Sequence, residues 1–570
     1  MRTSGIHMLL ISVAYLRSAV SIVQTRSGPV EGILDTYQGT LVEVFLGIPY
    51  AAPPVGNLRF KRTVPVQPWT EPLKSDRYSP ACVQYFPYKY PWVDKMLGQS
   101  EDCLHLNIWA PRSAYSTSKK AVMFWIYGGG FSSGSNRIET YDGGVLAAEG
   151  DVIVASVNYR LGVFGFLSTP SEEAPGNMGF FDILEALRWI KNNIHAFGGD
   201  PDNITLFGES GGAMISGLFC VSPLTVGLFR RVILESGAPA RLVEDTSYQM
   251  NLELGDKLAA EMGCSPNYAS LEQNPDGIVQ CLRGKDARVL AYASEALNNF
   301  SVVTFNYIFG DTLLPKNPRL AVIDLEFQNV EVLIGNNQDE GAFSLGVFMP
   351  EVFGPFGEKN PCVNKTFGST LIPQIIDTFP APSAAVEWYL GGLQENDCDD
   401  VRRQVYHAYG DYGIFCPDVY FAESFAKKGN SVYYYYFNHQ SSAAPWAGWM
   451  GVVHSDEIPF VFGRPLDYVY GVEKPFGFEK YWEYAVTDER PSEARRQCKA
   501  YYTSSEKQLS KEMISLWTNF AKYGTPSNEW HTFSRERHYV MTLQLQENRK
   551  SYLEQHFENC EFFRPYFGFS

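Results

Sequence analysis

Short apolar runs recur along the chain and are separated by polar, glycine-containing segments. The runs 121–127 and 152–157 are continuously apolar, which is typical of strands buried on both faces of a sheet. Between residues 180 and 197, apolar residues recur at helical spacing instead. Further strand-like runs, with helical segments between them, lie at 231–235, 330–334, 431–437 and 538–543. This alternation predicts an α/β fold with a large, mainly parallel sheet flanked by helices, and ligands at the carboxyl ends of its strands.

Two stretches, residues 245–300 and 343–411, are less periodic than the rest. We interpret them as insertions that cap the sheet. The sequence contains no internal repeat, low-complexity tract or interdomain linker. We therefore expect residues 20–570 to form a single domain, although 570 residues exceed the usual size of one.

The N-terminus has the layout of a secretory signal. Arg2 precedes an apolar stretch at 8–16, and small residues follow at Ser18 and Ala19. We expect residues 1–19 to be removed, and no other apolar run is long enough to span a membrane. Ten cysteines without a C-x-x-C motif favour an oxidising compartment over a metal site. The protein is therefore predicted to be secreted, with glycosylation sequons at Asn203, Asn299 and Asn364. Asn203 lies beside the predicted elbow strand, and we do not expect its sequon to be used.

The net charge of -16 gives information about the binding partners of the protein rather than about its fold. An acidic chain without a block of lysine or arginine does not suit nucleic acid as a partner. Its field would attract a cationic small molecule, although the simpler interpretation is that the charge keeps the protein soluble. The hydrophobic content of 45% argues against disorder.

The strongest chemical motif follows the apolar run that ends at Phe207. Gly208-Glu-Ser-Gly-Gly212 has the form G-x-S-x-G, in which a strand turns sharply into a helix and exposes the serine hydroxyl. Alone, this motif is a glycine-rich turn as often as a nucleophile. Gly128-Gly129-Gly130 end another predicted strand, so both glycine loops face the same edge of the sheet. Strand-GGG before strand-GxSxG predicts an oxyanion hole beside a nucleophilic Ser210.

A serine nucleophile also needs a histidine base and a carboxylate that orients the histidine. Asp339 and Glu340 follow the apolar run 330–334 and are both candidates by spacing, although Asp339 is more readily explained as a solvated loop acid. Among the later histidines, His454 lies in an aromatic-rich loop, and His439 is its rival. Spacing alone leaves both choices open.

The chain resembles the type-B carboxylesterase and cholinesterase family over nearly its whole length. The matching segments are Glu101-Asp-Cys-Leu-His-Leu-Asn107, Tyr127-Gly-Gly-Gly-Phe131, Phe207-Gly-Glu-Ser-Gly-Gly212, Asp339-Glu-Gly341 and Trp449-Met-Gly-Val-Val-His454. The resemblance implies an α/β-hydrolase fold for residues 20–570. It makes Ser210 the nucleophile, Glu340 the acid and His454 the base, with an oxyanion hole formed by Gly129, Gly130 and Gly211.

The resemblance also implies three disulfides, and these are Cys82–Cys103, Cys264–Cys281 and Cys416–Cys560. The remaining cysteines are Cys220, Cys362, Cys398 and Cys498, of which Cys362 and Cys398 share one insertion and are paired here on that ground.

Within the family, cholinesterases are the most similar group. Five residues resemble those that line the aromatic gorge of cholinesterases and are expected to bind substrate, namely Trp92, Glu209, Phe343, Trp446 and Trp449. Several features differ from that pattern. The loop 82–103 lacks the Met-Trp-Asn form usual in cholinesterases, Asp456 and Ser132 stand where cholinesterases have tyrosines, and residues 300–305 keep only some aromatics. These differences bear on choline specificity and not on ester hydrolysis.

We therefore predict a secreted serine esterase with a small-molecule ester as its substrate, without a metal or organic cofactor and without nucleic acid as a partner. A cholinesterase-like substrate range is the first choice, and broad carboxylesterase activity is the second. Members of the family also act as non-catalytic adhesion proteins, but these as a rule lack a complete triad. A homodimer is compatible with each of these interpretations.

Overall fold

The computed structural model describes residues 21–85, 98–115, 119–242, 247–297, 304–467, 502–545 and 550–570. The predicted signal at 1–19, Trp92, Cys498 and the sequon at Asn299 lie outside these residues. So do residues 300–303 of the stretch in which aromatics were compared with those of cholinesterases.

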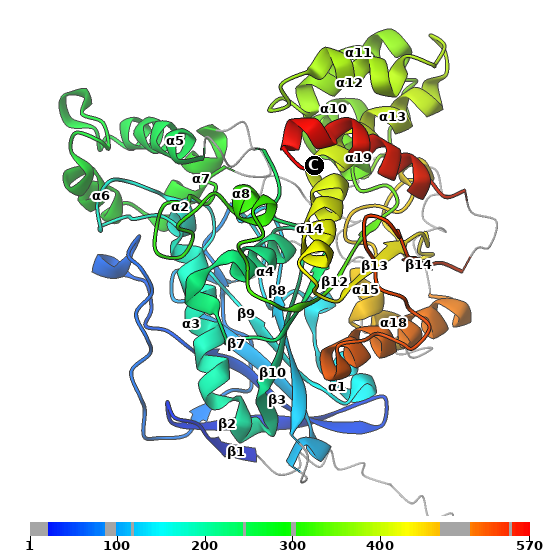
Figure 1. The fold of residues 1–570 in the computed structure, drawn as a ribbon. Coiled ribbons are helices and arrows are strands. Elements are labelled where there is room, and N and C mark those ends of the chain that lie inside the picture. Colours follow the sequence, from blue (N-terminus) through cyan, green and yellow to red (C-terminus); the bar gives the residue numbers. More distant parts are fainter. Residues whose placement is uncertain are drawn as a thin grey trace, which may run out of the picture.

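Within these residues, one twelve-stranded sheet forms the centre of the molecule (Figure 1). Its strands follow the spatial order β1-β2-β3-β7-β9-β8-β10-β11-β12-β13-β14, and β4 pairs with β2. The strands are β1 (Ser21–Gln24), β2 (Pro29–Tyr37), β3 (Thr40–Pro49), β4 (Leu73–Lys74), β7 (His105–Pro111), β8 (Lys120–Ile126), β9 (Ile153–Val157), β10 (Gly199–Glu209), β11 (Arg231–Glu235), β12 (Glu331–Asn337), β13 (Val432–Phe437) and β14 (Val540–Leu543). A separate short pair joins β5 (Ala81–Cys82) to β6 (Gln99–Ser100).

The sheet is parallel from β9 through β8 to β14 and antiparallel from β1 to β9, so the prediction of a mainly parallel sheet is confirmed. Every residue of β9, β11 and β13 is buried, which explains why these strands are mainly apolar or aromatic in sequence. Their polar residues are Ser156, Arg231 and Glu235. Because β8, β10, β12 and β13 run in the same direction, the loops after them meet at one edge.

Helices cover both faces of the sheet (Figure 1). Helices α1 (Gly144–Gly150) and α18 (Ser504–Tyr523) contact the sheet together, whereas α3 (Met178–Asn193), α4 (Gly211–Val221) and α14 (Cys416–Lys427) contact it as another group. The other helices are α2 (Gly162–Phe166), α5 (Ser247–Glu261), α6 (Pro275–Arg283), α7 (Ala287–Leu297), α8 (Pro318–Ile323), α9 (Ala342–Phe348), α10 (Pro350–Phe353), α11 (Lys365–Ile375), α12 (Pro382–Leu390), α13 (Cys398–Gly410), α15 (Ile458–Val461), α16 (Arg464–Asp467) and α19 (Leu553–Phe567).

The two less periodic stretches of the sequence are helical. They form α5–α7, at the upper left of Figure 1, and α9–α13, of which α10–α13 lie at its upper right. A π-helical turn, η8 (Asp411–Phe415), joins α13 to α14. None of the helices in the described part of the chain has the length and apolarity needed to cross a bilayer.

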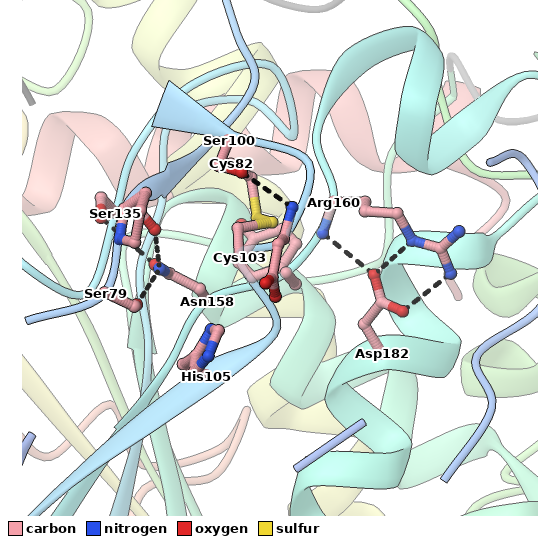
Figure 2. The surroundings of a disulfide bond; sticks show 12 residues. Ser79, Cys82, Ser100, Cys103, His105, Ser135, Asn158, Arg160 and Asp182 are labelled. Atoms are coloured by element: carbon pink, nitrogen blue, oxygen red, sulfur yellow. Dashed lines mark hydrogen bonds and ion pairs between the residues drawn. A yellow bond between two sulfur atoms is a disulfide. The ribbon is translucent and has the colours of Figure 1, made fainter. Parts of the chain in front are cut away.

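The described residues contain four disulfides. The three pairs that the family resemblance implied are present, and Cys362 pairs with Cys398 as expected from their shared insertion. Cys220 is a buried free thiol. Figure 2 shows Cys82–Cys103 beside the ion pair of Arg160 and Asp182, which are 2.8 Å apart and almost fully buried.

The disulfide Cys416–Cys560 spans 144 residues and ties α19 to α14. In the chain-entropy model, a loop of this length contributes roughly 5 kcal/mol to stability, against roughly 3 kcal/mol for a loop the size of Cys264–Cys281. We expect Cys416→Ser/Cys560→Ser to lower the melting temperature more than Cys264→Ser/Cys281→Ser does, as measured by thermal unfolding. Equal melting temperatures for the two double variants would contradict this ranking.

Candidate active site

Ser210 lies at the turn between β10 and α4. Its backbone has φ 56° and ψ −122°, a strained conformation for a residue with a side chain. The turn is held by Ser210 N, which donates to the carbonyl of Glu235 at 2.8 Å, and by Met214 N, which donates to the carbonyl of Ser210 at 2.9 Å. The sequence therefore predicted the elbow correctly: the strand ends, one strained serine follows, and a helix begins.

The glycines around Ser210 are required by close backbone packing. A Cβ at Gly212 would collide with the carbonyl oxygen of Ile126, and one at Gly128 would lie 2.9 Å from the Cβ of Ser210. Because a carbonyl of β8 occupies the space where a side chain would start, no larger residue fits at position 212.

The glycine loop after β8 lies beside the start of α4. A Cβ at Gly211 would lie 3.4 Å from the backbone nitrogen of Gly130, so the two residues are adjacent. Gly129 and Gly130 have φ 107° and 58°, values that favour glycine. Gly211 is the first residue of α4, where backbone N–H groups have no partner within the helix. An anion placed here would meet N–H donors and the positive end of the helix dipole.

His454 and Glu340 form a short contact. The Nδ1 atom of His454 lies 2.6 Å from Oε2 of Glu340. The other oxygen of Glu340 accepts hydrogen bonds from the Ser236 hydroxyl at 2.5 Å and the Asn337 N–H at 2.7 Å. These donors fix the carboxylate so that Oε2 faces the imidazole. Phe343 stacks on the His454 ring at 5.0 Å between centroids and limits its rotation.

Glu209 lies on the other side of the imidazole. Its Oε1 atom is 3.0 Å from Nε2 of His454 and accepts a hydrogen bond from the Ser455 hydroxyl at 2.5 Å. Because Glu209 directly precedes Ser210, this contact places the base beside the elbow. Glu209 is 3% exposed, so its charge is shielded little by solvent.

Two carboxylates flanking one imidazole favour its charged form. Burial lowers the pKa of His454, but Glu209 and Glu340 outweigh burial and raise it to about 9. Since this pKa is above the ordinary value of about 6.5, the charged contacts stabilise the fold fully below pH 6.5 or so, and the stabilisation is lost as the pH rises through about 9.

The rival histidine has a different partner. His439 Nε2 lies 3.1 Å from Oε1 of Glu506. The same oxygen accepts a hydrogen bond from the backbone N–H of Ser442. Glu506 also forms the capping box of α18 with Thr503. Hydrogen bonds from these groups lower the pKa of Glu506 to about 2 despite its burial. His439 thus belongs to a contact that anchors α18.

Asp339 was wrongly predicted to be a solvated loop acid. It is 2% exposed and accepts hydrogen bonds from several groups, including the backbone N–H of Val452 at 2.9 Å. The loop 449–454 and helix α13 cover it, and neither contact is visible in the local sequence.

Three of the four aromatic residues predicted to bind substrate lie within the described part of the chain, and their contacts differ. Phe343 contacts His454 directly. Trp446 donates from Nε1 to Asp456 at 2.9 Å, and Trp449 donates to the carbonyl of Gly357 at 2.7 Å with its ring against Arg402. Trp449 is therefore committed to packing contacts, whereas Trp446 connects to the loop of His454 through Asp456. Trp92 lies outside the described residues.

Asp456 is buried although its side chain is an acid. It stands at a position where the cholinesterases that the chain resembles have a tyrosine. Its two oxygens accept from Trp446 and from the backbone N–H of Val453, the latter at 2.8 Å. Burial raises the pKa of Asp456 to about 7, and these hydrogen bonds oppose the rise. Ser132 is 4% exposed.

Comparison with known proteins adds a second line of evidence. A family model described as the carboxylesterase family matches residues 19–563. The chain belongs to the carboxylesterase family. This carboxylesterase-family chain is 35% identical to Acetylcholinesterase-1 of Trittame loki, with 98% of each chain covered. It is also 35% identical to Cholinesterase of Mus musculus, over 96% of this chain and 87% of that relative. Acetylcholinesterase of Bungarus fasciatus is 34% identical over 92% of this chain and 83% of the relative.

Membership of the carboxylesterase family defines both the fold and the type of reaction. The fold of this chain is that of the α/β-hydrolases, as predicted, and the chain is a carboxylic ester hydrolase. The names of these relatives describe cholinesterases.

Several residues of the site were not singled out from the sequence. Ser236 and Asn337 orient Glu340, and Ser455 donates to Glu209. Glu457 is also fully buried, and burial together with Glu209 and Glu340 raises its pKa well above the ordinary value. Ser236 follows β11 directly, as Ser210 follows β10, so its position at a strand end was the available signal.

The contact between Glu209 and His454 leads to a prediction about pH dependence. Glu209→Gln removes a negative charge 3.0 Å from the imidazole, so the pKa of His454 should fall, by roughly one to three units for an opposite charge this near. If His454 must be neutral to act, the acid limb of the pH profile of kcat/KM moves to lower pH. Glu506→Gln, at the contact with His439, is the matched control and should leave the limb in place. An unmoved limb in Glu209→Gln would contradict the role of this charge.

Proposed function

We propose that Ser210, His454 and Glu340 form the catalytic triad of this hydrolase, and that it cleaves choline esters through an acyl-enzyme. The observation that supports the triad best is the imidazole of His454, held by Glu340 at 2.6 Å on one side and placed beside the Ser210 elbow on the other. Ser210 is half-buried at its strained turn, and the backbone of Gly130 is adjacent to Gly211.

In the proposed reaction, the Ser210 hydroxyl attacks the ester carbonyl carbon while Nε2 of His454 accepts its proton. The carbonyl oxygen becomes an oxyanion, which the N–H groups of the Gly129-Gly130 loop and Gly211 stabilise. His454 then donates its proton to the departing alcohol, and the acyl group remains on Ser210. A water molecule, deprotonated by His454, attacks this second ester and releases the acid.

Choline esters are proposed because the site combines buried negative charge with aromatic side chains. Glu209 is 3% exposed, and Phe343 lies against the catalytic imidazole. A quaternary ammonium group is attracted by such carboxylates and by aromatic faces, the latter contributing up to about 2 kcal/mol when desolvated. Three relatives whose names specify cholinesterases support the same choice.

A broad carboxylesterase activity is the second candidate, and the observation that favours it is Asp456. Its carboxyl group is fixed to the indole of Trp446 and is not available to a ligand in this arrangement. Because an acid here replaces an aromatic ring, the wall of the site differs from that of the resembled cholinesterases. A purely adhesive role is least favoured, because His454 contacts both Glu340 and Glu209, the neighbour of Ser210, and this supports a complete triad.

We propose further that the enzyme acts outside the cell or in another oxidising compartment. Four disulfides within the described residues support this location, because disulfides persist where the environment is oxidising.

The test is hydrolysis of acetylthiocholine and of phenyl acetate by the native protein and by Ser210→Ala. Both esters should be cleaved, with acetylthiocholine preferred, and Ser210→Ala should lower kcat roughly 10⁶-fold, the loss known for the nucleophile of subtilisin. His439→Gln is the control and should keep most of the activity. Cleavage of phenyl acetate alone would overturn the choline proposal and leave the carboxylesterase. Unchanged activity in Ser210→Ala would overturn the assigned nucleophile.

A further inference from the structure

Asp339, the residue before the proposed catalytic acid, joins the loop after β12 to the loop that carries His454. The Val452 N–H donates to Oδ2 of Asp339, and the Asp339 N–H donates to the carbonyl of Val452, both at 2.9 Å. Asp339 also forms a parallel β-bridge with Val453. The two loops are thus paired one residue away from both Glu340 and His454.

The space around this pairing is tightly filled. Gly451 has φ 75°, and a Cβ there would collide with Oδ2 of Asp339. Asn337 adds a second tie, since its Nδ2 atom donates to the carbonyl of Val453 at 2.9 Å. A shift of the carboxylate would therefore be transmitted to the backbone of 451–453.

The other oxygen of Asp339 is held by helix α13. The Tyr406 hydroxyl donates to Oδ1 at 3.2 Å, and Nε2 of His407 lies 3.4 Å from the same atom. His407 is 1% exposed, and its Nδ1 atom has no hydrogen-bond partner among the described residues. This assigns the ring proton to Nε2, where it faces Asp339.

A second histidine and carboxylate lie behind the first pair. The rings of His407 and His556 are 4.8 Å apart, and Nδ1 of His556 contacts Asp411 at 2.5 Å. His556 Nε2 lies 3.0 Å from the carbonyl of Gln338, the neighbour of Asp339. Asp411 begins the π-helical turn η8 and accepts hydrogen bonds from Tyr389 and Asn559. Helices α12, α13 and α19 therefore all contribute to the support of Asp339.

The groups around Asp339 stabilise its ionised carboxylate. Although burial alone would raise the pKa of Asp339, the hydrogen bonds from His407 and Val452 lower it below its ordinary value. Burial lowers the pKa of His407, so at neutral pH the pair consists of a carboxylate and a neutral imidazole. Hydrogen bonds to a carboxylate are roughly twice as strong as those between neutral groups.

We propose that Asp339 is a positioning residue, which holds the loop of His454 in register with Glu340. The inference rests on the proposed triad, because it concerns the alignment of its base and acid. It assigns no contact between Asp339 and the ester.

The chemistry of the side chain explains why an acid is needed here. Each carboxylate oxygen of Asp339 accepts from two groups, Val452 and Gln338 on Oδ2 and Tyr406 and His407 on Oδ1. An asparagine has one acceptor oxygen and one donating NH₂ group, so one of the two pairs would face a donor. The loop must then move to relieve this conflict, and a displacement of about 1 Å can lower the rate roughly 100-fold.

The test is Asp339→Asn, compared with the native protein in kcat, KM and melting temperature on the ester that the native protein cleaves best. We expect kcat to fall by about 10- to 100-fold with KM almost unchanged, because alignment affects the transition state more than substrate binding. Glu506→Gln is the matched control: it disrupts a buried carboxylate–histidine contact of similar length, 3.1 Å, in a segment that carries no triad residue. It should lower the melting temperature while leaving kcat near the native value.

An Asp339→Asn protein with reduced melting temperature and native kcat would overturn the proposal and make the residue purely structural. If Asp339→Asn does not fold, His407→Phe decides in its place: a folded variant with lowered kcat supports the proposal, and one with native kcat overturns it. Failure of the proposed function is a separate result, because the native protein itself would then cleave no ester.

Discussion

The glycines packed against the turn at Ser210 have no room for side chains, and the rest of the site depends on this close packing. Backbone atoms of Ile126 and Ser210 occupy the positions where Cβ atoms of Gly212 and Gly237 would lie. The elbow is therefore held between the ends of β8 and β11, which keeps a serine at φ 56° although such a conformation costs about 1–3 kcal/mol. The parallel pairing of β10 with β8 and β11 holds the backbone in this strained conformation.

The second constraint is electrostatic. Glu209, Glu340 and Glu457 are almost completely buried near one histidine, an arrangement that is costly unless the charges are compensated. Hydrogen bonds from Ser236, Ser455 and Asn337 supply part of the compensation, and His454 supplies the rest.

The parts of the protein that could be predicted from sequence are those with local causes. Continuous apolar runs predicted the parallel strands, and the glycine spacing around Ser210 predicted the elbow, because backbone sterics act over a few residues. The burial of Asp339 was missed because its partners, His407 and Val452, come from segments more than 60 residues away in sequence. A polar loop after a strand is usually solvated, and only the packing of α13 and of residues 449–454 removes the solvent here.

The central claim, that Ser210 is the nucleophile of this family member, is tested most directly by covalent labelling. A fluorophosphonate probe reacts with a serine that is activated by a neighbouring base and leaves a stable adduct whose position mass spectrometry can identify. We expect one adduct, on the proteolytic peptide that contains Ser210, and we expect it to be lost when the protein is denatured before labelling. An adduct on a different residue, or none on the folded protein, would contradict it.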